Sequence, residues 1–410
     1  MGAEPGSTAR ARSRPVSCPR RAFIAPVSRG APMFSSFLGP PEVSFAEHET
    51  SRFIESRLRE LGLDVRECPT ETGALAVLDT GRPGRTVMLR ADIDALPILE
   101  ESGVSYASRH EGRMHACGHD AHTAILLGTA HALAERVEDL TGSYLFCFQP
   151  AEELVSGARE MIARGLFDHH HPDVTIGLHM ASWLPSGTVT TRPGLLWAGG
   201  DAFELAILGP GGHGGMMKRA GNVISAQAFL LERLYTVVDG LEYEGTGCHC
   251  TVGDVSTDGT WNVVPRSVRV RGTVRTFTPE LREEALQRMR DLLLEADTEF
   301  QVHSELKLVH GTIPIFNDPN VTATVLDVGA QLIGDRASRL GKPLTVSDDM
   351  AEFLTRIPGC YFMLGGCPPD AETPPAHHSP TFRLDEASFA TGVRMMVATA
   401  ARLAAEPPQP

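Results

Sequence analysis

Residues 85–94 read RTVMLRADID, a short apolar run that ends in two aspartates. Residues 142–153, GSYLFCFQPAEE, and residues 173–180, DVTIGLHM, have the same form, with a glutamate pair and a histidine at their ends. Short apolar runs that are bounded by turn residues predict buried β-strands. We therefore expect several buried strands whose carboxyl ends carry polar side chains.

Helical patterns separate these expected strands. Residues 44–65 place apolar side chains at helical spacing, and residues 121–137 and 156–167 are also helical in pattern. Strands that alternate with helices predict an α/β fold with a mostly parallel mixed sheet flanked by helices. Residues 73–80 form another short apolar run, separated from 85–94 only by the turn signal GRPGR, so these two are expected to be neighbouring strands.

The pattern changes between about residues 198 and 310. Residues 201–209 and 266–277 alternate apolar and polar side chains, whereas residues 222–241 and 279–300 have helical periodicity. This order of strands and helices inside an α/β chain predicts an inserted α+β unit with a sheet covered on one face. The chain is then expected to return to the first sheet.

These patterns predict three parts of the chain. Residues 1–36 contain six arginines and one glutamate, with many Ser, Pro and Gly. Because no continuous apolar stretch is present, they favour a disordered extension, or a start codon placed too far upstream, over a targeting segment. Residues 37–197 and 311–405 are expected to form the larger domain, and residues 198–310 the inserted one.

Composition limits the class of function. The chain has 410 residues and a formal net charge of −14, which disfavours nucleic-acid partners because phosphates would be repelled. No apolar run approaches the ~18 residues needed to span a membrane. The eight cysteines are scattered rather than densely spaced, which favours a reducing compartment such as the cytoplasm. A two-domain cytoplasmic enzyme acting on a small molecule is the resulting expectation.

Residues 115–122, HACGHDAH, concentrate residue types that bind metals. Polar residues at strand ends in open α/β sheets meet at one rim, so Asp92, Asp94 and His179 are expected to join this segment. A thiolate with imidazoles and carboxylates suits zinc, manganese, cobalt or nickel better than calcium or magnesium. The alternative is that Cys117 is a small buried apolar residue and the histidines only pack. The agreement of several strand ends favours the metal site.

The adjacent residues Glu152 and Glu153 are expected to have two different chemical roles. One carboxylate can bind a metal while its neighbour accepts a proton from water. The alternative, two solvated loop glutamates, is hard to reconcile with the apolar strand that precedes them.

Nine motifs in this chain carry a family resemblance. They are LRADIDALP, HACGHDAHTAILLGTA, FQPAEE, GLH, GPGGHGG, NVVP, RGTVRTF, IPGCYFMLGG and HHSPTFRLDE. Their order resembles that of the hippurate hydrolase-like amidohydrolases, a subfamily of the aminoacylase and carboxypeptidase metallopeptidases of M20 type. This subfamily includes plant IAA-amino acid hydrolases and bacterial N-acyl-amino-acid deacylases. The resemblance runs from about Pro41 to Ala405 and implies a zinc-exopeptidase-like domain interrupted by a smaller lid and dimerisation domain.

The resemblance also implies roles for single residues. The implied metal ligands are Cys117, His119, Glu153, His179 and His378. Glu152 is implied to be the general base, and Asp94 resembles the carboxylate that orients a ligand.

Three residues of the inserted domain have implied roles in substrate binding. His213 in GPGGHGG is similar to a histidine that reaches the substrate across a dimer interface, and Asn262 and Arg275 match polar lid residues. The alternative is that all three are ordinary loop or strand surface residues.

The resemblance implies a metal-dependent amidohydrolase that cleaves hippurate-like, N-acetyl or aryl-acyl amino acids into a carboxylic acid and a free amino acid. Two divalent ions per subunit, of zinc, manganese, cobalt or nickel, and a homodimer are part of this expectation. A metallo-dipeptidase or carboxypeptidase is one alternative. A non-catalytic acyl-amino-acid binding protein is another, which the intact Glu152 and ligand positions argue against.

Some features depart from the family pattern or from a metal-site interpretation. GGMMKRAG follows GGH where small residues and proline are usual, so the substrate preference stays open. Asp348 in SDDM stands where a glutamate is more common. The histidines at 169–171 and the cysteines Cys248 and Cys250 are expected at the surface rather than at a metal.

Overall fold

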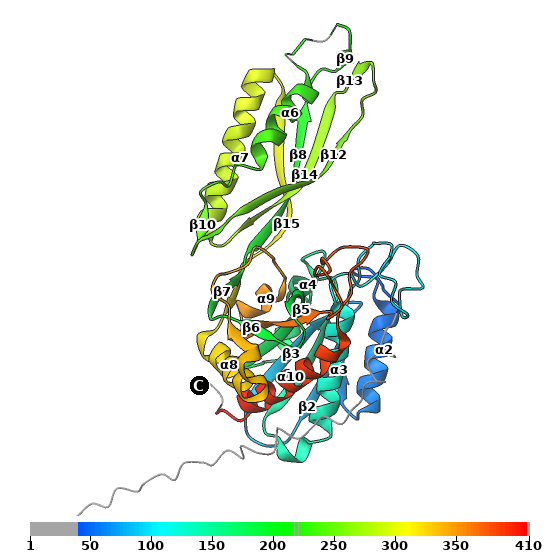
Figure 1. The fold of residues 1–410 in the computed structure, drawn as a ribbon, viewed down its shortest axis with the longest axis vertical. Helices are drawn as coiled ribbons and strands as arrows, with labels where there is room; N and C mark the ends of the chain where they lie inside the picture. Colours follow the sequence, from blue (N-terminus) through cyan, green and yellow to red (C-terminus); the bar gives the residue numbers. More distant parts are fainter. Residues whose placement is uncertain (1–39, 217, 220, 408–410) are drawn as a thin grey trace, which may run out of the picture.

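The computed structural model describes residues 40–216, 218–219 and 221–407, and the extension predicted at residues 1–36 lies outside them. Figure 1 shows a larger body built on one sheet and a second, elongated body that projects from it. The chain runs through the larger body, enters the projecting one and returns.

The larger body contains an eight-stranded sheet in the order β1-β2-β4-β3-β5-β18-β6-β17. The strands are β1 Asp64–Arg66, β2 Ala74–Asp79, β3 Thr86–Asp92, β4 Ser143–Gln149, β5 Val174–Pro185, β6 Val189–Thr191, β17 Ala337–Arg339 and β18 Gly359–Cys367. The central pairs β4-β3, β3-β5 and β5-β18 are parallel, whereas β1-β2, β2-β4 and β18-β6 are antiparallel. The predicted mostly parallel mixed sheet is confirmed.

The expected pairing of residues 73–80 with residues 85–94 is wrong. β4 lies between β2 and β3, with Leu75 opposite Cys147 and Leu89 opposite Phe146. β3 and β4 are parallel and connected through helix α3, so β4 occupies the edge of β3 that a direct hairpin partner would need.

Helices cover both faces of this sheet, because alternate side chains of each buried strand point to opposite sides. In β18, Phe362 packs in one core, whereas Tyr361 and Met363 pack in the other. One face carries α2 His48–Glu60, α3 His119–Ala134, α8 Pro319–Ile333 and α10 Phe389–Ala404. The opposite face carries α4 Gly157–Ala163, α5 Leu166–His169 and α9 Met350–Leu354.

The projecting body is a four-stranded antiparallel sheet in the order β12-β14-β8-β15. Its elements are β8 Gly199–Leu208, α6 Val223–Leu234, β12 His249–Thr257, β14 Ser267–Thr276, α7 Pro279–Phe300 and β15 His303–Thr312. Phe203 and Leu205 of β8 pack toward the two helices, whereas Glu204 on the other face lies near Arg269. The predicted α+β insertion is confirmed, with helices on one face only (Figure 1).

The surface position expected for Cys248 and Cys250 is wrong, since both are buried in the core of the projecting body. Cys248 directly precedes β12 and Cys250 lies in it, and both belong to the core that includes side chains of α6 and α7. The short paired segments are β7 Gly194–Trp197 with β16 Ile315–Asn317, β9 Gly212–His213 with β13 Val263–Val264, and β10 Glu242–Tyr243 with β11 Thr246–Gly247. Over the described ranges, the structure has no helix with the length and apolar character needed to cross a membrane.

Candidate metal centre

Acidic and imidazole side chains in or directly after three strands of the larger sheet lie at the same edge of that sheet. β3 ends at Asp92, with Asp94 two residues later, and the glutamate pair follows the end of β4 at Gln149. His179 lies inside β5, which continues to Pro185 instead of ending near His179 as its apolar run suggested. Because β3 lies parallel to both β4 and β5, these residues share one edge of the sheet.

The turn before α3 supplies the thiol and a further imidazole. Gly118, between Cys117 and His119, has φ +94°, a left-handed conformation that favours glycine. A Cβ at this position would lie 3.2 Å from the Leu384 side chain and 3.3 Å from that of Met180. Backbone conformation and close packing therefore both favour glycine between the two predicted ligands.

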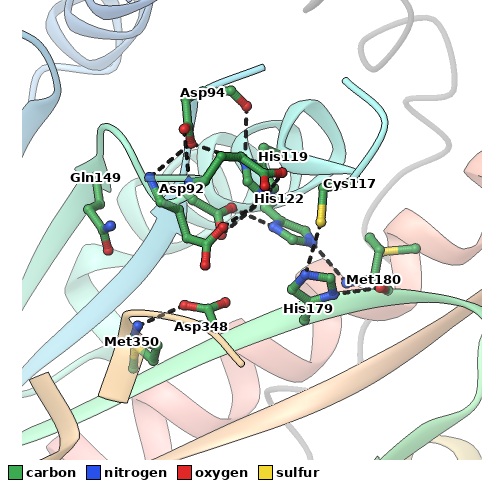
Figure 2. Close-up of polar contacts among 12 residues, drawn as sticks. Asp92, Asp94, Cys117, His119, His122, Gln149, His179, Met180, Asp348 and Met350 are labelled. Atoms are coloured by element: carbon green, nitrogen blue, oxygen red, sulfur yellow. Dashed lines mark hydrogen bonds and ion pairs between the residues drawn. The ribbon is translucent and has the colours of Figure 1, made fainter. Parts of the chain in front are cut away.

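The five residues predicted as metal ligands lie together in the structure. Cys117 Sγ is 3.5 Å from His179 Nε2, and the two side chains face each other in Figure 2. The possible ligand atoms of Cys117, His119 and His179 all lie within 4.8 Å of one another. The possible ligand atoms of Cys117, Glu153 and His378 also lie within 4.8 Å of one another. In this second group, His378 Nε2 is 3.5 Å from Glu153 Oε1. Cys117 belongs to both groups.

Two buried atoms of this cluster have no hydrogen-bond partner in the described part of the chain, His119 Nε2 and Glu153 Oε1. They are 3.8 Å apart, too far for a hydrogen bond, and a buried polar atom without a partner is costly. A cation between them would satisfy both. Together with the thiol and the other imidazoles, they form a donor set that fits a divalent transition metal rather than calcium or magnesium.

Asp94 holds both His119 and the loop that carries the glutamate pair. Its Oδ1 accepts a hydrogen bond from Glu152 N at 3.1 Å, and its Oδ2 accepts from Glu153 N at 3.1 Å and Ser44 Oγ at 2.6 Å. His119 Nδ1 donates to the Asp94 carbonyl oxygen at 2.9 Å, which leaves Nε2 available for a metal. These are the contacts expected of an orienting residue.

His122 lies beside the centre, and both of its ring nitrogens are occupied. Nδ1 donates to Asp92 Oδ1 at 2.5 Å, and Nε2 accepts from Met180 N at 2.8 Å. The Met180 carbonyl oxygen accepts from His179 Nδ1 at 2.7 Å. His122 therefore supports the segment that orients His179, a role that its place in HACGHDAH alone does not distinguish from ligation (Figure 2).

A buried ion network next to the centre was not foreseen from the sequence. Arg90 has a fully buried side chain that forms ion pairs with Asp92 at 2.9 Å and with Asp348 and Asp349 at 3.1 Å each. Tyr361 Oη donates to Asp348 Oδ2 at 2.6 Å. The available signal was the arginine inside an otherwise apolar strand, because a buried charge requires partners.

We expect Arg90→Met to lower the free energy of unfolding by ~3–5 kcal/mol, because it leaves buried carboxylates without their cation. The matched control is Arg59→Met, which breaks a surface ion pair with Glu55 and should cost less than ~1 kcal/mol. Urea denaturation followed by circular dichroism measures both variants. Equally small losses would show that the buried network adds little stability.

Burial dominates the pKa values of the glutamate pair. It raises the pKa of Glu152 well above the usual range, and repulsion from Asp348 and Glu153 adds to this shift. Burial also raises the pKa of Glu153 to about 7, although His119 opposes the shift. A bound cation would act in the opposite direction and favour both ionised carboxylates.

The three residues predicted in the inserted unit do not lie together. Arg275, near the end of β14, donates from Nη1 to Ser347 Oγ at 2.7 Å and lies close enough to Glu152 to interact with its charge. His213 in β9 and Asn262, directly before β13, are exposed at the far end of the projecting body (Figure 1). Of the three, only Arg275 lies beside the metal-ligand cluster of its own chain.

His377, directly before the predicted ligand His378, is a further residue at this site. Its ring lies 5.5 Å from that of His179, 5.2 Å from that of Trp183 and 4.7 Å from that of Phe382, measured between centroids. Sequence reasoning did not single it out, although it is the first histidine of HHSP. It lies in a turn of the loop between β18 and α10, and its ring faces the cluster.

A family model and several known proteins are similar to this chain over most of its length. Residues 88–402 match the family described as Peptidase family M20/M25/M40. The chain is 37% identical over 368 residues to the N-acetyl-L-cysteine deacetylase of Bacillus subtilis (strain 168), covering 88% of this chain and 85% of that protein. It is 31% identical over 367 residues to the IAA-amino acid hydrolase ILR1-like 5 of Arabidopsis thaliana, covering 88% and 83% respectively.

A solved structure shares both the fold and the family. The Bacillus subtilis YXEP protein, described as a dinuclear metal binding peptidase from the M20 family, matches with a TM-score of 0.75 and 29% identity. The match covers 91% of this chain and 97% of that one. The resemblance found in the sequence motifs is confirmed: this chain belongs to peptidase family M20/M25/M40 and is a metal-dependent hydrolase of amide C–N bonds.

Proposed function

We propose that this enzyme cleaves the amide bond of N-acyl amino acids and releases a carboxylic acid and a free amino acid. The observation that carries the proposal is the position of Glu152, which is buried with Oε2 3.8 Å from His119 Nε2. Its neighbour Glu153 faces the other ligand atoms. Two relatives are named for hydrolysis of N-acetyl-L-cysteine and of IAA-amino acids, which supports this substrate class.

We assign two divalent ions, of zinc, manganese, cobalt or nickel, to the cluster, because its possible ligand atoms form more than one group of three. The residues assigned to hold them are Cys117, His119, Glu153, His179 and His378. When bound, such ions polarise the acyl carbonyl and make water easier to deprotonate.

Glu152 is assigned as the general base. It accepts a proton from the water that attacks the acyl carbon, and it later donates that proton to the nitrogen of the departing amino acid. Asp94 keeps Glu152 in place by accepting its backbone N–H at 3.1 Å. The proton taken in the first step is returned in the second, so Glu152 ends the cycle unchanged.

Arg275 is assigned to the carboxylate of the amino-acid half of the substrate. Its side chain is half-buried, held through Ser347 Oγ and placed near Glu152. A guanidinium offers five N–H donors in a planar arrangement that matches a carboxylate. One end of the substrate would thus be fixed while its amide bond lies near Glu152.

Arg275→Gln is expected to reduce kcat/KM for an N-acetyl amino acid by about 10- to 150-fold, the usual value of a hydrogen bond to a charged group. With the same substrate amidated at its carboxylate, the loss should be less than about threefold, since the contact is already missing. Arg269→Gln, on an exposed part of the same strand, is the control. Equal losses on both substrates would contradict carboxylate binding by Arg275.

We propose that residues 198–310 form a lid and dimerisation domain, and that residues 37–197 and 311–405 form the catalytic domain. His213 lies far from the metal-ligand cluster of its own chain, which supports a role in the partner's site. Next to it, Met216 and Trp261 are 82% and 94% exposed, and exposed apolar side chains of this size are typical of interfaces. In this arrangement His213 and Asn262 contact substrate bound to the partner subunit, where His213 stabilises the developing oxyanion.

We also propose that the enzyme acts in the cytoplasm. All the cysteines in the described residues are free, as is usual in a reducing compartment.

A substrate panel tests the proposed reaction. Purified enzyme is reconstituted with zinc, manganese, cobalt or nickel and assayed on N-acetyl and N-benzoyl amino acids and on unblocked dipeptides with the same carboxyl-terminal residue. We expect kcat/KM to be at least ~10-fold higher for the N-acyl compounds, a difference of ~1.4 kcal/mol in transition-state binding. A preference for dipeptides would assign a dipeptidase instead. Faster cleavage of benzoyl than of acetyl compounds would support hippurate-like specificity.

A further inference from the structure

His377 lies against the thiol of Cys117, one of the assigned metal ligands. Its Nδ1 is 3.7 Å from Cys117 Sγ, a distance compatible with a hydrogen bond to the large sulfur atom. His377 can donate a hydrogen bond to the sulfur only if Nδ1 carries the proton of the ring. Otherwise it would bind a metal itself or only pack against the cluster.

The backbone of Ser182 determines which nitrogen of His377 carries the proton. Ser182 N lies 3.3 Å from His377 Nε2, and a backbone N–H can only donate. Nε2 is therefore the unprotonated acceptor, so a neutral ring has its proton on Nδ1. That proton is directed toward Cys117 Sγ.

Direct ligation by His377 is the less favoured interpretation. Among the described residues, the clusters of possible ligand atoms lying within 4.8 Å of one another do not contain His377. Its Nε2 is engaged by Ser182, and its ring is packed between His179, Trp183 and Phe382. The ring is thus held in one orientation, with Nδ1 as the only nitrogen that faces the cluster.

We propose that His377 is a positioning residue that donates a hydrogen bond from Nδ1 to the metal-binding thiolate of Cys117. The inference rests on the proposed assignment of Cys117 as a ligand. A donor to a metal thiolate stabilises the deprotonated sulfur and fixes its direction, so its loss changes the electronic properties of the sulfur and weakens the metal site. His377 would therefore strengthen the binding of metal by the Cys117 thiolate.

Cobalt substitution tests this role because a Co(II)–thiolate pair has a charge-transfer absorption that reports on the sulfur. His377→Phe keeps an aromatic ring but removes the donor, whereas His377→Asn keeps an N–H near the position of Nδ1. Trp183→Phe is the packing control, since it alters a ring neighbour of His377 without touching the hydrogen bond. Absorption spectra and chelator competition are measured for all three variants and the parent.

We expect His377→Phe to bind the full complement of cobalt but ~10–100-fold more weakly, the usual effect of losing an outer hydrogen bond to a ligand. Its charge-transfer band should move to longer wavelength because the sulfur lone pairs are no longer stabilised. His377→Asn and Trp183→Phe should keep the parental band and an affinity within about threefold of the parent. His377→Leu repeats the test if the phenylalanine variant does not fold.

Three results would overturn the inference. If His377→Phe kept the parental charge-transfer band and cobalt affinity, His377 would only pack against the cluster. Loss of one cobalt per chain in both the phenylalanine and asparagine variants would make His377 a direct ligand. Absence of the band from the parental cobalt enzyme would refute Cys117 as a ligand, so it would overturn the proposed metal centre together with this inference.

Discussion

Glu152→Gln is expected to lower kcat by ~10²–10⁴, the usual contribution of a general base. Glutamine has nearly the size of glutamate, so the buried position beside His119 stays filled, but the amide cannot accept the proton from water. Metal content should stay at the parental level because Glu152 is not among the assigned ligands. Steady-state kinetics on an N-acetyl amino acid and elemental analysis of the same sample measure both effects.

Glu153→Gln is the matched variant, since it makes the same chemical change one residue later. It should lower metal content, because Glu153 Oε1 is a buried atom that depends on a cation for a partner. Equal metal content in the two variants would show that the roles within the pair are assigned wrongly. Activity of Glu152→Gln within about tenfold of the parent would remove it as the general base.

Mixing His213→Ala with Glu152→Gln is expected to restore activity, although each variant alone should be inactive. If His213 serves the partner's site, one site of a mixed dimer combines Glu152 from the first variant with His213 from the second. The other site carries both lesions, so recovery reaches at most about half of the parental activity per mixed dimer. Subunit exchange is verified by native mass spectrometry, and activity is followed on an N-acetyl amino acid.

The control is a mixture of Glu152→Gln with Glu153→Gln. Both residues serve the site of their own chain, so every site in the mixed dimer keeps one lesion and no activity should return. Absence of recovery in the first mixture despite verified exchange would place His213 in its own chain's site or outside catalysis. A monomer by light scattering would also contradict the proposed arrangement.

Local sequence patterns located the strands and the helix that carry the candidate site, whereas the roles of single residues came from the family resemblance. Apolar runs located β3, β4 and β5 and showed that Asp94, Glu152 and His179 follow or occupy buried strands. The helix pattern located α3, whose first residue is His119. These signals are local, because the residue pattern of each segment indicates whether it is buried and where it ends. Parallel strands then bring their carboxyl ends together.

The parts that could not be predicted depend on contacts between distant segments. The insertion of β4 between β2 and β3 is a matter of strand order, which a short turn signal does not report. Arg90 meets Asp348 only after the chain has passed through the projecting body and returned. The tautomer of His377 likewise follows from Ser182, far away in sequence. Residue type and periodicity give no information about such partners.

The metal dependence of N-acyl amino acid cleavage is measured by titrating metal into chelator-stripped enzyme and following hydrolysis at each step. We expect no turnover without metal, activity that rises as zinc, manganese, cobalt or nickel is bound, and a plateau near the two ions per chain assigned to the cluster. The products should be the carboxylic acid and the free amino acid. Full activity in stripped enzyme, or no cleavage of any N-acyl amino acid with any of the four metals, would contradict the proposed metal-dependent reaction.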